Sequence, residues 1–310
     1  MKKIFDCAIL GGGIAGVSAA LYTRRAGLES FLFEPKAIGG QLLFMERVDN
    51  YPGLAAGTKG STLAAQLVQT VKELGDGHIE DKVCGLALVN NLVTLRCAQD
   101  EYSARSVIIA TGASFRKLGL SREIELTGRG VSYCAICDGF FFRGKDVAVI
   151  GGGNSALEEA LYLARLCRSV HLIHRRDSLR ALDYLHAEVS KTKNITIHYQ
   201  SVVRELRGTD MLEAITLTQE GNAKALELPV SGMFVAIGVQ PVTSLARGII
   251  ELDEKGFIVT DEFMKTSCDS IFSCGDCRKR PLRQLITAAS EGAIAAVSAY
   301  KYLKGSYISS

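Results

Sequence analysis

"CAILGGGIAGVSAALYTRRAGLESFLFE" (residues 7–34) recurs without a gap as "VAVIGGGNSALEEALYLARLCRSVHLIH" (residues 147–174). Each copy has an apolar run, three glycines, a segment of helical periodicity that contains Leu-Tyr, and a second apolar run that ends in a polar residue. This order is typical of a strand, a tight turn, a helix and a second strand. The chain is therefore predicted to contain two βαβ units.

Both units carry the glycine pattern of dinucleotide-binding folds. The first glycine permits the tight turn, the second lets the backbone approach a pyrophosphate, and the third small residue lets helix pack on strand. The phosphates then lie at the helix N-terminus. One such motif is weak evidence, but two copies between a strand and a helix predict two dinucleotide sites. The residues are Gly11, Gly13 and Gly16 in the first unit, and Gly151, Gly153 and Ala156 in the second.

The end of the second strand distinguishes the two sites. An acid at this place accepts hydrogen bonds from ribose hydroxyls, whereas cations receive a 2′-phosphate. The first unit ends in "LFEP", so Glu34 suits the adenosine of FAD or NAD. The second ends in "LIHRRDSLR", where Arg175, Arg176 and Arg180 suit NADPH because guanidinium groups match phosphate geometry. The alternative for these arginines is a solvated strand end.

The segments outside the two units are predicted to form strands and one long helix. "KVCGLALVNNLVTLRC" (82–97) alternates about an Asn-Asn turn and predicts a hairpin, followed by the apolar strand of "EYSARSVIIATG" (101–112). "HYQSVVREL" (198–206) and "EAITLTQEG" (213–221) predict a second hairpin, and "GMFVAIGVQP" (232–241) a second apolar strand. The closing "RQLITAASEGAIAAVSAYKYL" (283–303) has helical period and small residues on one face, so we expect a buried helix.

Length and composition are those of a globular protein of about two domains. The 310 residues include 47% hydrophobic and 22% charged residues, with a net charge of +3 spread among nearly equal numbers of acids and bases. This distribution argues against a nucleic-acid-binding protein. The densest basic run, "RKR" (278–280), is either a solvated loop or a contact with a cofactor phosphate or an acidic partner.

The N-terminal "MKKIFDCAILGGG" superficially resembles a signal peptide. Asp6 and the glycines interrupt its apolar run, so we read it as a strand and a turn, and we expect a cytoplasmic protein. No stretch approaches the uncharged length of a membrane-spanning helix, and no membrane association is expected.

Cys134 and Cys137 form a Cys-x-x-Cys pair in "SYCAICDGFFF" (132–142). Such a pair can hold a metal, form a structural staple or shuttle electrons. The chain has nine cysteines at irregular spacings and no export signal, so a secreted disulfide framework is disfavoured. In a reducing compartment the pair is therefore expected to be catalytic or metal-binding.

A second Cys-x-x-Cys occurs in "SCGDCRK" (273–279). With Cys268 it superficially suggests a metal site, but a structural zinc needs four ligands and no further pair or histidine lies nearby. We expect no metal. Cys274 and Cys277 are then either free thiols or an auxiliary redox pair. The remaining cysteines are expected to be small buried residues: Cys7, Cys84, Cys97 and Cys167.

Taken together, the motifs of the chain resemble those of low-molecular-weight thioredoxin reductases, which are flavoprotein disulfide reductases. The resembling segments are "GGGIAG", "GGQL", "NYPG", "ATGA", "CAICDG", "GGGNSALEEAL", "HRRDSLRA", "FVAIG", "CGD" and "RQLITAASEG", which extend over almost the whole chain. The resemblance implies an α/β fold of two Rossmann-like domains, each with three layers, a parallel sheet and a small antiparallel sheet. Residues 1–114 and 246–310 would form an FAD-binding domain. Residues 115–245 would form an inserted NADPH-binding domain that carries the Cys-x-x-Cys.

The resemblance also implies which residues hold the cofactors. For FAD these are Gly11, Gly13, Gly16, Glu34, Pro35, Gly40, Gln41, Leu42, Asn50, Thr111, Gly112, Gly275, Asp276, Arg283 and Gln284. Residues 34–42 would follow the adenosine half, Asn50 would lie by the isoalloxazine, and residues 276–284 along the ribityl chain and ring. For NADPH they are Gly151, Gly153, Asn154, Ser155, Ala156, His174, Arg175, Arg176, Arg180, Ile237 and Gly238.

The resemblance further implies the chemistry of the cysteines. Electrons would pass from NADPH through FAD to a Cys134–Cys137 disulfide and then to thioredoxin by thiol–disulfide exchange. Cys134 would attack thioredoxin and Cys137 would contact the flavin. Asp138 would act as the acid or base, with a pKa raised by the apolar "GFFF" beside it. A homodimer is expected, as is a rotation of the NADPH domain about hinges at residues 114–118 and 240–244.

Some positions depart from the family pattern. Ile136 replaces a small polar residue, Val239 stands where a histidine is usual, and Cys274 and Cys277 replace small apolar residues. Two other functions stay open. One is a flavoenzyme of the same fold in a peroxide-reducing system or with ferredoxin as donor, although ferredoxin would not require the three arginines. The other is a flavin-bound redox sensor without turnover.

Overall fold

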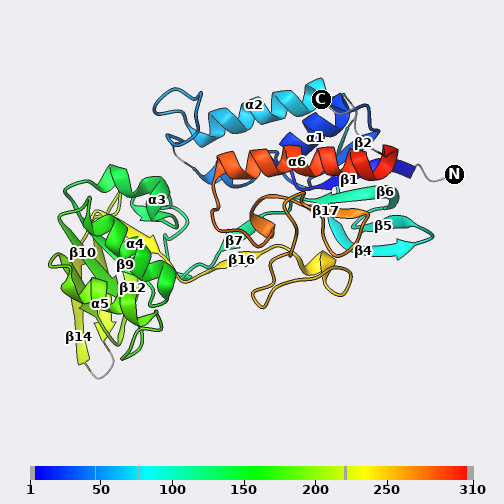
Figure 1. Cartoon of the computed structure of the whole chain (residues 1–310). Coiled ribbons are helices and arrows are strands. Elements are labelled where there is room, and N and C mark those ends of the chain that lie inside the picture. Colours follow the sequence, from blue (N-terminus) through cyan, green and yellow to red (C-terminus); the bar gives the residue numbers. More distant parts are fainter. Residues whose placement is uncertain (1–3, 46, 76, 220–221, 306–310) are drawn as a thin grey trace. The chain divides into compact units, whose positions relative to one another are not determined.

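The computed structural model describes residues 4–45, 47–75, 77–219 and 222–305. The chain forms two compact units, which we call unit 1 (Met1–Ser114 and Gln240–Ser310) and unit 2 (Phe115–Val239) (Figure 1). The first three residues of the signal-peptide-like pattern and residues 220–221 of the second predicted hairpin lie outside the described residues.

Unit 1 is built on a sheet whose centre is parallel. β1 (Ile4–Leu10) pairs in parallel with β2 (Ser30–Phe33) and with β6 (Glu101–Ile109). The short β3 (His78–Ile79) extends the sheet beyond β2, and β17 (Ile271–Ser273) pairs with the C-terminal part of β6. These strands are almost wholly apolar at their C-terminal ends, as expected for strands that are covered on both faces.

The first predicted hairpin is confirmed. β4 (Val83–Val89) and β5 (Leu92–Cys97) pair antiparallel about Asn90 and Asn91, whose φ angles of 50° and 61° suit a tight hairpin turn. β5 continues antiparallel to β6, so the hairpin extends the main sheet. The prediction that Cys84 is buried is wrong. Cys84 is the extra residue of a bulge in the edge strand β4 and is exposed, while Cys97 is half-buried.

The first and last helices of unit 1 pack closely against each other. α1 (Ile14–Arg25) and α6 (Leu285–Lys304) lie side by side (Figure 1). Their contact is close, because a methyl group on Gly292 would collide with the carbonyl oxygen of Ala15, and Ser18 Oγ donates to Ala289 O at 2.7 Å. The predicted closing helix is thus confirmed. The other helical elements are α2 (Gly60–Glu73), η1 (Gly40–Phe44), η3 (Ser244–Ala246) and η4 (Gly275–Cys277).

Unit 2 repeats the parallel arrangement. Its sheet has the order β11 (Ile195–His198), β10 (Ser169–Ile173), β9 (Asp146–Ile150), β15 (Gly232–Val235) and β8 (Val131–Ser132), with all pairs parallel. α4 (Asn154–Ala164) and α5 (Asp183–Lys191) pack on one face. The opposite face packs against the small antiparallel sheet of β12 (Ser201–Arg207), β13 (Ala214–Gln219) and β14 (Asn222–Pro229).

Both units therefore have the predicted α/β architecture with parallel sheets. The chain crosses between them in β7 (Ala113–Phe115) and β16 (Val239–Pro241), which pair with each other. Within the described residues, no helix is long and apolar enough to cross a membrane.

Candidate redox and nucleotide-binding sites

Cys134 and Cys137 form a disulfide, with Cα atoms 5.3 Å apart. Cys137 lies in the short helix α3 (Ala135–Asp138), and Cys134 is the N-cap of this helix. Cys134 Sγ accepts a hydrogen bond from the Cys137 N–H at 3.3 Å. Both cysteines are half-buried, whereas Ala135 between them packs into the core of unit 2. The core thus anchors the helix and leaves the sulfur atoms partly accessible.

Asp138 lies at the end of α3 and is tied to the start of the same segment. Ser132 Oγ donates to Asp138 Oδ2 at 2.6 Å and accepts from the Cys134 N–H at 3.1 Å. Burial raises the pKa of Asp138, and the hydrogen bond from Ser132 opposes that rise. The predicted direction of the pKa shift is confirmed. A carboxyl group that titrates closer to neutrality is suited to exchange protons with thiols.

Sequence reasoning did not identify Ser132, nor the contacts of Tyr133. The Tyr133 hydroxyl donates to Glu123 Oε1 at 2.8 Å, and its ring stacks on Phe115 at 5.4 Å between centroids. Glu123 is almost fully buried and also accepts the backbone N–H groups of residues 118–120. Only the proximity of Ser132 and Tyr133 to Cys134 in the sequence could have drawn attention to them.

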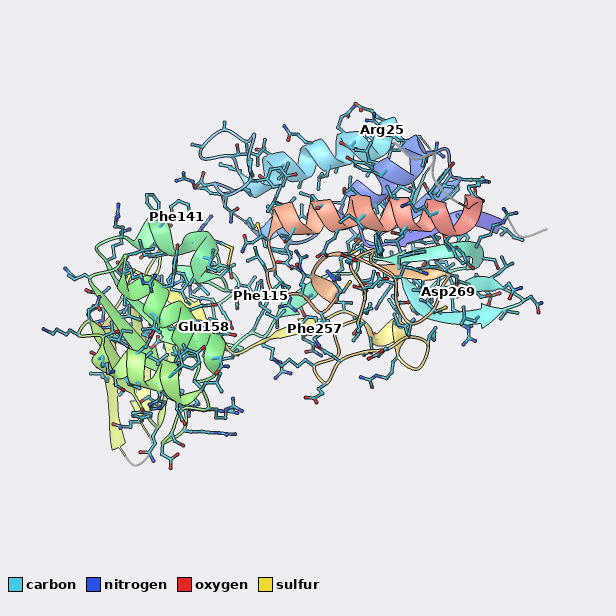
Figure 2. The ribbon with its side chains drawn as sticks, in the orientation of Figure 1. Arg25, Phe115, Phe141, Glu158, Phe257 and Asp269 are labelled. Carbon is cyan, nitrogen blue, oxygen red and sulfur yellow. A yellow bond between two sulfur atoms is a disulfide. The ribbon has the colours of Figure 1, made fainter. Side chains whose placement is uncertain are left out.

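An apolar surface lies next to the disulfide. Ile136 is 58% exposed and Phe140 is 63% exposed, and the Arg143 guanidinium lies 5.8 Å from the centre of the Phe140 ring. Phe141, labelled in Figure 2, follows Phe140 in η2 (Gly139–Phe142), while Phe142 points into the core. Exposed aromatic and branched apolar side chains such as these are suited to contact another protein beside the two sulfur atoms.

The second glycine motif forms the turn between β9 and α4. A Cβ on Gly153 would have no protein atom within 4 Å, so this backbone is open to a ligand. A Cβ on Gly152 would collide with the ring of His174, which is buried against the turn. In the described part of the chain His174 Nε2 has no hydrogen-bond partner, and burial lowers its pKa. These features fit a nucleotide at the N-terminus of α4.

The predicted phosphate-binding arginines lie next to this turn. The Arg180 backbone N–H donates to Gly152 O at 2.7 Å, and Asn154 Oδ1 accepts from the N–H of Leu182 at 3.0 Å. Arg175, Arg176 and Arg180 are exposed, and no carboxylate pairs with them among the residues that the structure describes. Ile237 and Gly238 follow β15, which pairs with β9 beside the same turn. The predicted residues of unit 2 are thus brought together.

The first glycine motif forms the equivalent turn in unit 1. Gly11 has φ 113° and a Cβ on it would collide with Ala110 O, while a Cβ on Gly13 would meet open space. Glu34 Oε2 accepts the Gly12 N–H at 2.9 Å, which fixes the acid at the end of β2 over the turn. Gly16 lies against Gly11, and Pro35 is exposed beside Glu34.

Residues from distant parts of unit 1 meet near this turn. A Cβ on Gly40 would lie 3.0 Å from Gly13 Cα, and Gln41 Nε2 donates to Asp276 Oδ2 at 3.3 Å. Gln41 also reaches Ala113 O, next to Thr111 and Gly112. Leu42 is the buried residue of η1, and Gly275 precedes Asp276 in η4.

The remaining predicted residues of unit 1 adjoin the start of α6. Asn50 Nδ2 donates to Gln284 Oε1 at 2.9 Å. The Arg283 guanidinium lies 4.2 Å from the centre of the ring of Phe257, which is labelled in Figure 2, and its buried Nε has no partner in the described residues. A buried donor without an acceptor, a glycine turn open to ligand and an acid at the end of β2 fit a bound flavin dinucleotide.

Cys274 and Cys277 are free, fully buried thiols in unit 1. Burial raises the pKa of both, so they stay protonated and are poor nucleophiles. Cys277 Sγ lies within 3.4 Å of Ser273 Oγ and of Ile109 O. In the described ranges no group of three or more histidine, cysteine or acidic side chains could hold a metal ion.

Comparison with known proteins gives consistent matches over the whole chain. A family model described as "Pyridine nucleotide-disulphide oxidoreductase" matches residues 5–292. The thioredoxin reductase of Peptoclostridium litorale is 39% identical over 310 residues, with 98% of each chain covered.

Two solved structures extend the comparison. The crystal structure of thioredoxin reductase from Streptococcus pyogenes MGAS5005 has a TM-score of 0.95 at 36% identity, covering 99% of this chain and 100% of that one. Lactococcus lactis thioredoxin reductase in its "FR conformation" has a TM-score of 0.64 at 38% identity, covering 96% and 99%.

Proposed function

Since the chain belongs to the pyridine nucleotide-disulphide oxidoreductase family, and within it to the thioredoxin reductases, we propose that it reduces a thioredoxin-like protein with electrons from NADPH. Family membership implies the use of a flavin and a pyridine nucleotide. The observation that carries the proposal is the half-buried Cys134–Cys137 disulfide, flanked by the acid Asp138 and the exposed side chains of Ile136 and Phe140.

The proposed cofactors are FAD in unit 1 and NADPH in unit 2. Glu34 supports an adenosine with a free 2′-hydroxyl in unit 1, and the orphaned Nε of Arg283 supports a bound acceptor there. The exposed Arg175, Arg176 and Arg180 support a 2′-phosphate beside the second glycine turn. When bound, FAD would supply the two-electron relay between a nicotinamide and a disulfide.

The side chains of the chain perform the exchange with the protein substrate. The Cys134 thiolate attacks one sulfur of the substrate disulfide, and the other substrate sulfur leaves as a thiolate and takes up a proton. The Cys137 thiolate then attacks Cys134 Sγ, which releases the reduced substrate and restores the Cys134–Cys137 disulfide. As a base, the Asp138 carboxylate takes the proton of the attacking thiol, and the hydrogen bond from Ser132 holds this carboxylate in place.

Rotation of one unit about residues 114–118 and 240–244 forms part of the proposal. The two relatives above have similar identity and coverage but TM-scores of 0.95 and 0.64. A change in the placement of two domains lowers a whole-chain TM-score while each domain keeps its fold. This difference supports more than one arrangement within the family.

A homodimer and a cytoplasmic location are also proposed. The homodimer rests on the family resemblance. The location rests on the cysteine pattern, in which seven thiols are free among the residues that the structure describes.

Trapping of a mixed disulfide tests the roles of the two cysteines. A Cys137→Ser variant, reduced and mixed with oxidised thioredoxin, should retain thioredoxin through Cys134, because the resolving thiol is missing. Cys134→Ser should not form this adduct, and adding Cys84→Ser, which removes an exposed thiol of unit 1, to Cys137→Ser should leave the adduct unchanged. An adduct formed by the Cys134→Ser variant, or an adduct that disappears when Cys84 is replaced, would contradict the assignment. Steady NADPH oxidation with thioredoxin in the wild type would exclude a redox sensor.

A further inference from the structure

Arg280 lies within residues 276–284, which the family resemblance predicts to follow the flavin, but it is not one of the residues predicted to hold the cofactor. The side chain of Arg280 is 1% exposed, and its Nη1 lies 3.2 Å from Glu291 Oε2 and 3.5 Å from Asp276 Oδ1. Asp276 belongs to η4 and Glu291 to α6. Burial of a guanidinium is costly unless carboxylates compensate its charge, so these contacts fix where Arg280 points.

Glu291 is already satisfied by other partners. Its Oε1 accepts from Arg278 Nη1 at 2.7 Å, and its Oε2 accepts from the Gly275 N–H at 2.8 Å. Arg278 therefore compensates the charge of Glu291. Arg280 thus pairs with a carboxylate that Arg278 also compensates, and its positive charge acts on Asp276 as well.

Asp276 needs such a cation to stay ionised. Burial raises its pKa, and Glu291 raises it further, whereas Arg280, Arg283 and the hydrogen bond from Gln41 lower it. Arg280 is the largest of the lowering influences. The neighbouring Cys277 adds no negative charge, because burial raises the pKa of its thiol.

A second observation indicates a ligand at this cluster. The buried Nε of Arg280 has no hydrogen-bond partner in the described part of the chain, and neither has the buried Nε of Arg283. Since buried donors are almost always satisfied in native proteins, these two orphaned donors indicate an acceptor that the polypeptide does not supply. The cluster also has one net positive charge, because it contains three arginines and two carboxylates. These are Arg278, Arg280 and Arg283, and Asp276 and Glu291.

We propose that Arg280 is a positioning residue for the flavin cofactor, which keeps the Asp276 carboxylate ionised and oriented to accept hydrogen bonds from hydroxyl groups of the bound FAD. The inference rests on the proposed function, which places FAD in unit 1. It assigns to "RKR" (278–280) a role in cofactor binding instead of a solvated loop. Arg280 acts through Asp276, and Glu291 holds the turn that presents Asp276.

The pH dependence of FAD affinity separates this role from a merely structural one. The apoprotein is titrated with FAD between about pH 6 and about pH 9, and binding is followed by quenching of flavin fluorescence. Arg280→Met removes the charge and keeps most of the side-chain volume. It should weaken FAD binding by about tenfold or more at the acidic end, where Asp276 becomes protonated, and less as the pH rises. The wild type and Arg280→Lys should show a flat profile.

Two further variants sharpen the test. Asp276→Asn should weaken FAD binding equally at every pH. The double variant Asp276→Asn/Arg280→Met should likewise show no pH dependence, because the titrating carboxyl is absent. The control Arg25→Met removes an exposed arginine at the end of α1 and should bind FAD as the wild type does. If Arg280→Met does not fold, Glu291→Gln tests the coupling with the opposite sign. Loss of this acid leaves Asp276 more strongly ionised, so in a titration extended below about pH 6 the profile should stay flat to a lower pH than in the wild type.

The outcomes are distinguishable from failure of the proposed function. A wild-type protein that binds no FAD at any pH would contradict the proposed function itself. Wild-type binding combined with a pH-independent loss, or no loss, in Arg280→Met would overturn only the role of Arg280. A Glu291→Gln profile that becomes pH-sensitive at higher pH than the wild type would overturn it as well.

Discussion

Removal of the Ser132 hydroxyl should slow thiol–disulfide exchange at acidic pH by about tenfold to about a hundredfold. Ser132 Oγ donates a 2.6 Å hydrogen bond to Asp138 Oδ2, and Ser132 is almost fully buried. A hydrogen bond to a charged group stabilises it by about 1.5–3 kcal/mol, and 1.4 kcal/mol corresponds to about a factor of ten in a rate or an equilibrium. Without Ser132 the carboxylate is less stable, the pKa of Asp138 rises further, and less of the base is available at a given pH.

The assay separates this effect from loss of structure. Enzyme reduced with NADPH is mixed in a stopped-flow instrument with oxidised thioredoxin, and the exchange rate is measured from about pH 6 to about pH 9. The limb of the profile that reports Asp138 should move to higher pH in Ser132→Ala, and the rates should converge with the wild type at alkaline pH. Ser132→Thr keeps the hydroxyl and should recover most of the rate.

Two controls complete the experiment. Asp138→Asn should abolish the limb while hydride transfer from NADPH to the flavin is unchanged. Ser190→Ala removes an exposed hydroxyl on α5 and should have no effect. A Ser132→Ala profile whose limb does not move, or whose rate falls equally at all pH values, would refute the role given to the Ser132–Asp138 hydrogen bond.

Three further predictions concern unit 2. Burial raises the pKa of Glu159 from its ordinary 4.5 to about 7, so the fold favours the protonated form and loses stability as the pH rises from about 4.5 to about 7. Glu159→Gln should therefore increase the free energy of unfolding at pH 8 by up to about 3 kcal/mol and change it little at about pH 4.5. Urea midpoints that are the same for the variant and the wild type at both pH values would contradict this prediction. Alanine at Arg175 and Arg176 should raise the KM for NADPH by about tenfold to a hundredfold and leave that for NADH unchanged, whereas equal changes for both coenzymes would argue against a 2′-phosphate site. Tyr133→Phe leaves the buried Glu123 without its 2.8 Å hydroxyl donor and should destabilise unit 2 by about 1–3 kcal/mol in urea unfolding, and an unchanged midpoint would exclude this contribution.

Local patterns allowed much of the fold to be predicted. The glycine turns, the Asn90–Asn91 hairpin and the closing helix each depend on residues that are adjacent in the sequence, so backbone preferences and periodicity identify them. The repeat of one βαβ unit within the chain predicted two parallel sheets. The direction of the pKa shift of Asp138 followed in the same way from its apolar neighbours.

The remaining features depend on contacts between distant residues. Burial of Arg280 requires Glu291 from α6, and no pattern near "RKR" indicates that the two approach each other. Cys84 lies in an apolar alternating run, but a bulge in an edge strand exposes it. Glu159 is charged and helical, yet its carboxyl is buried where α4 packs. Such sites are decided by tertiary packing, which overrides the local pattern.

Stepwise reduction of the FAD-loaded protein under anaerobic conditions tests the proposed electron path most directly. NADPH is added while the flavin absorbance is recorded, and oxidised thioredoxin follows. The proposed function predicts bleaching of the flavin by NADPH and rapid recovery of its absorbance with thioredoxin, and no recovery in Cys134→Ser. Absence of bleaching with NADPH, but bleaching with reduced ferredoxin, would contradict the assignment of Arg175, Arg176 and Arg180. Recovery with thioredoxin in Cys134→Ser would contradict the assignment of the disulfide.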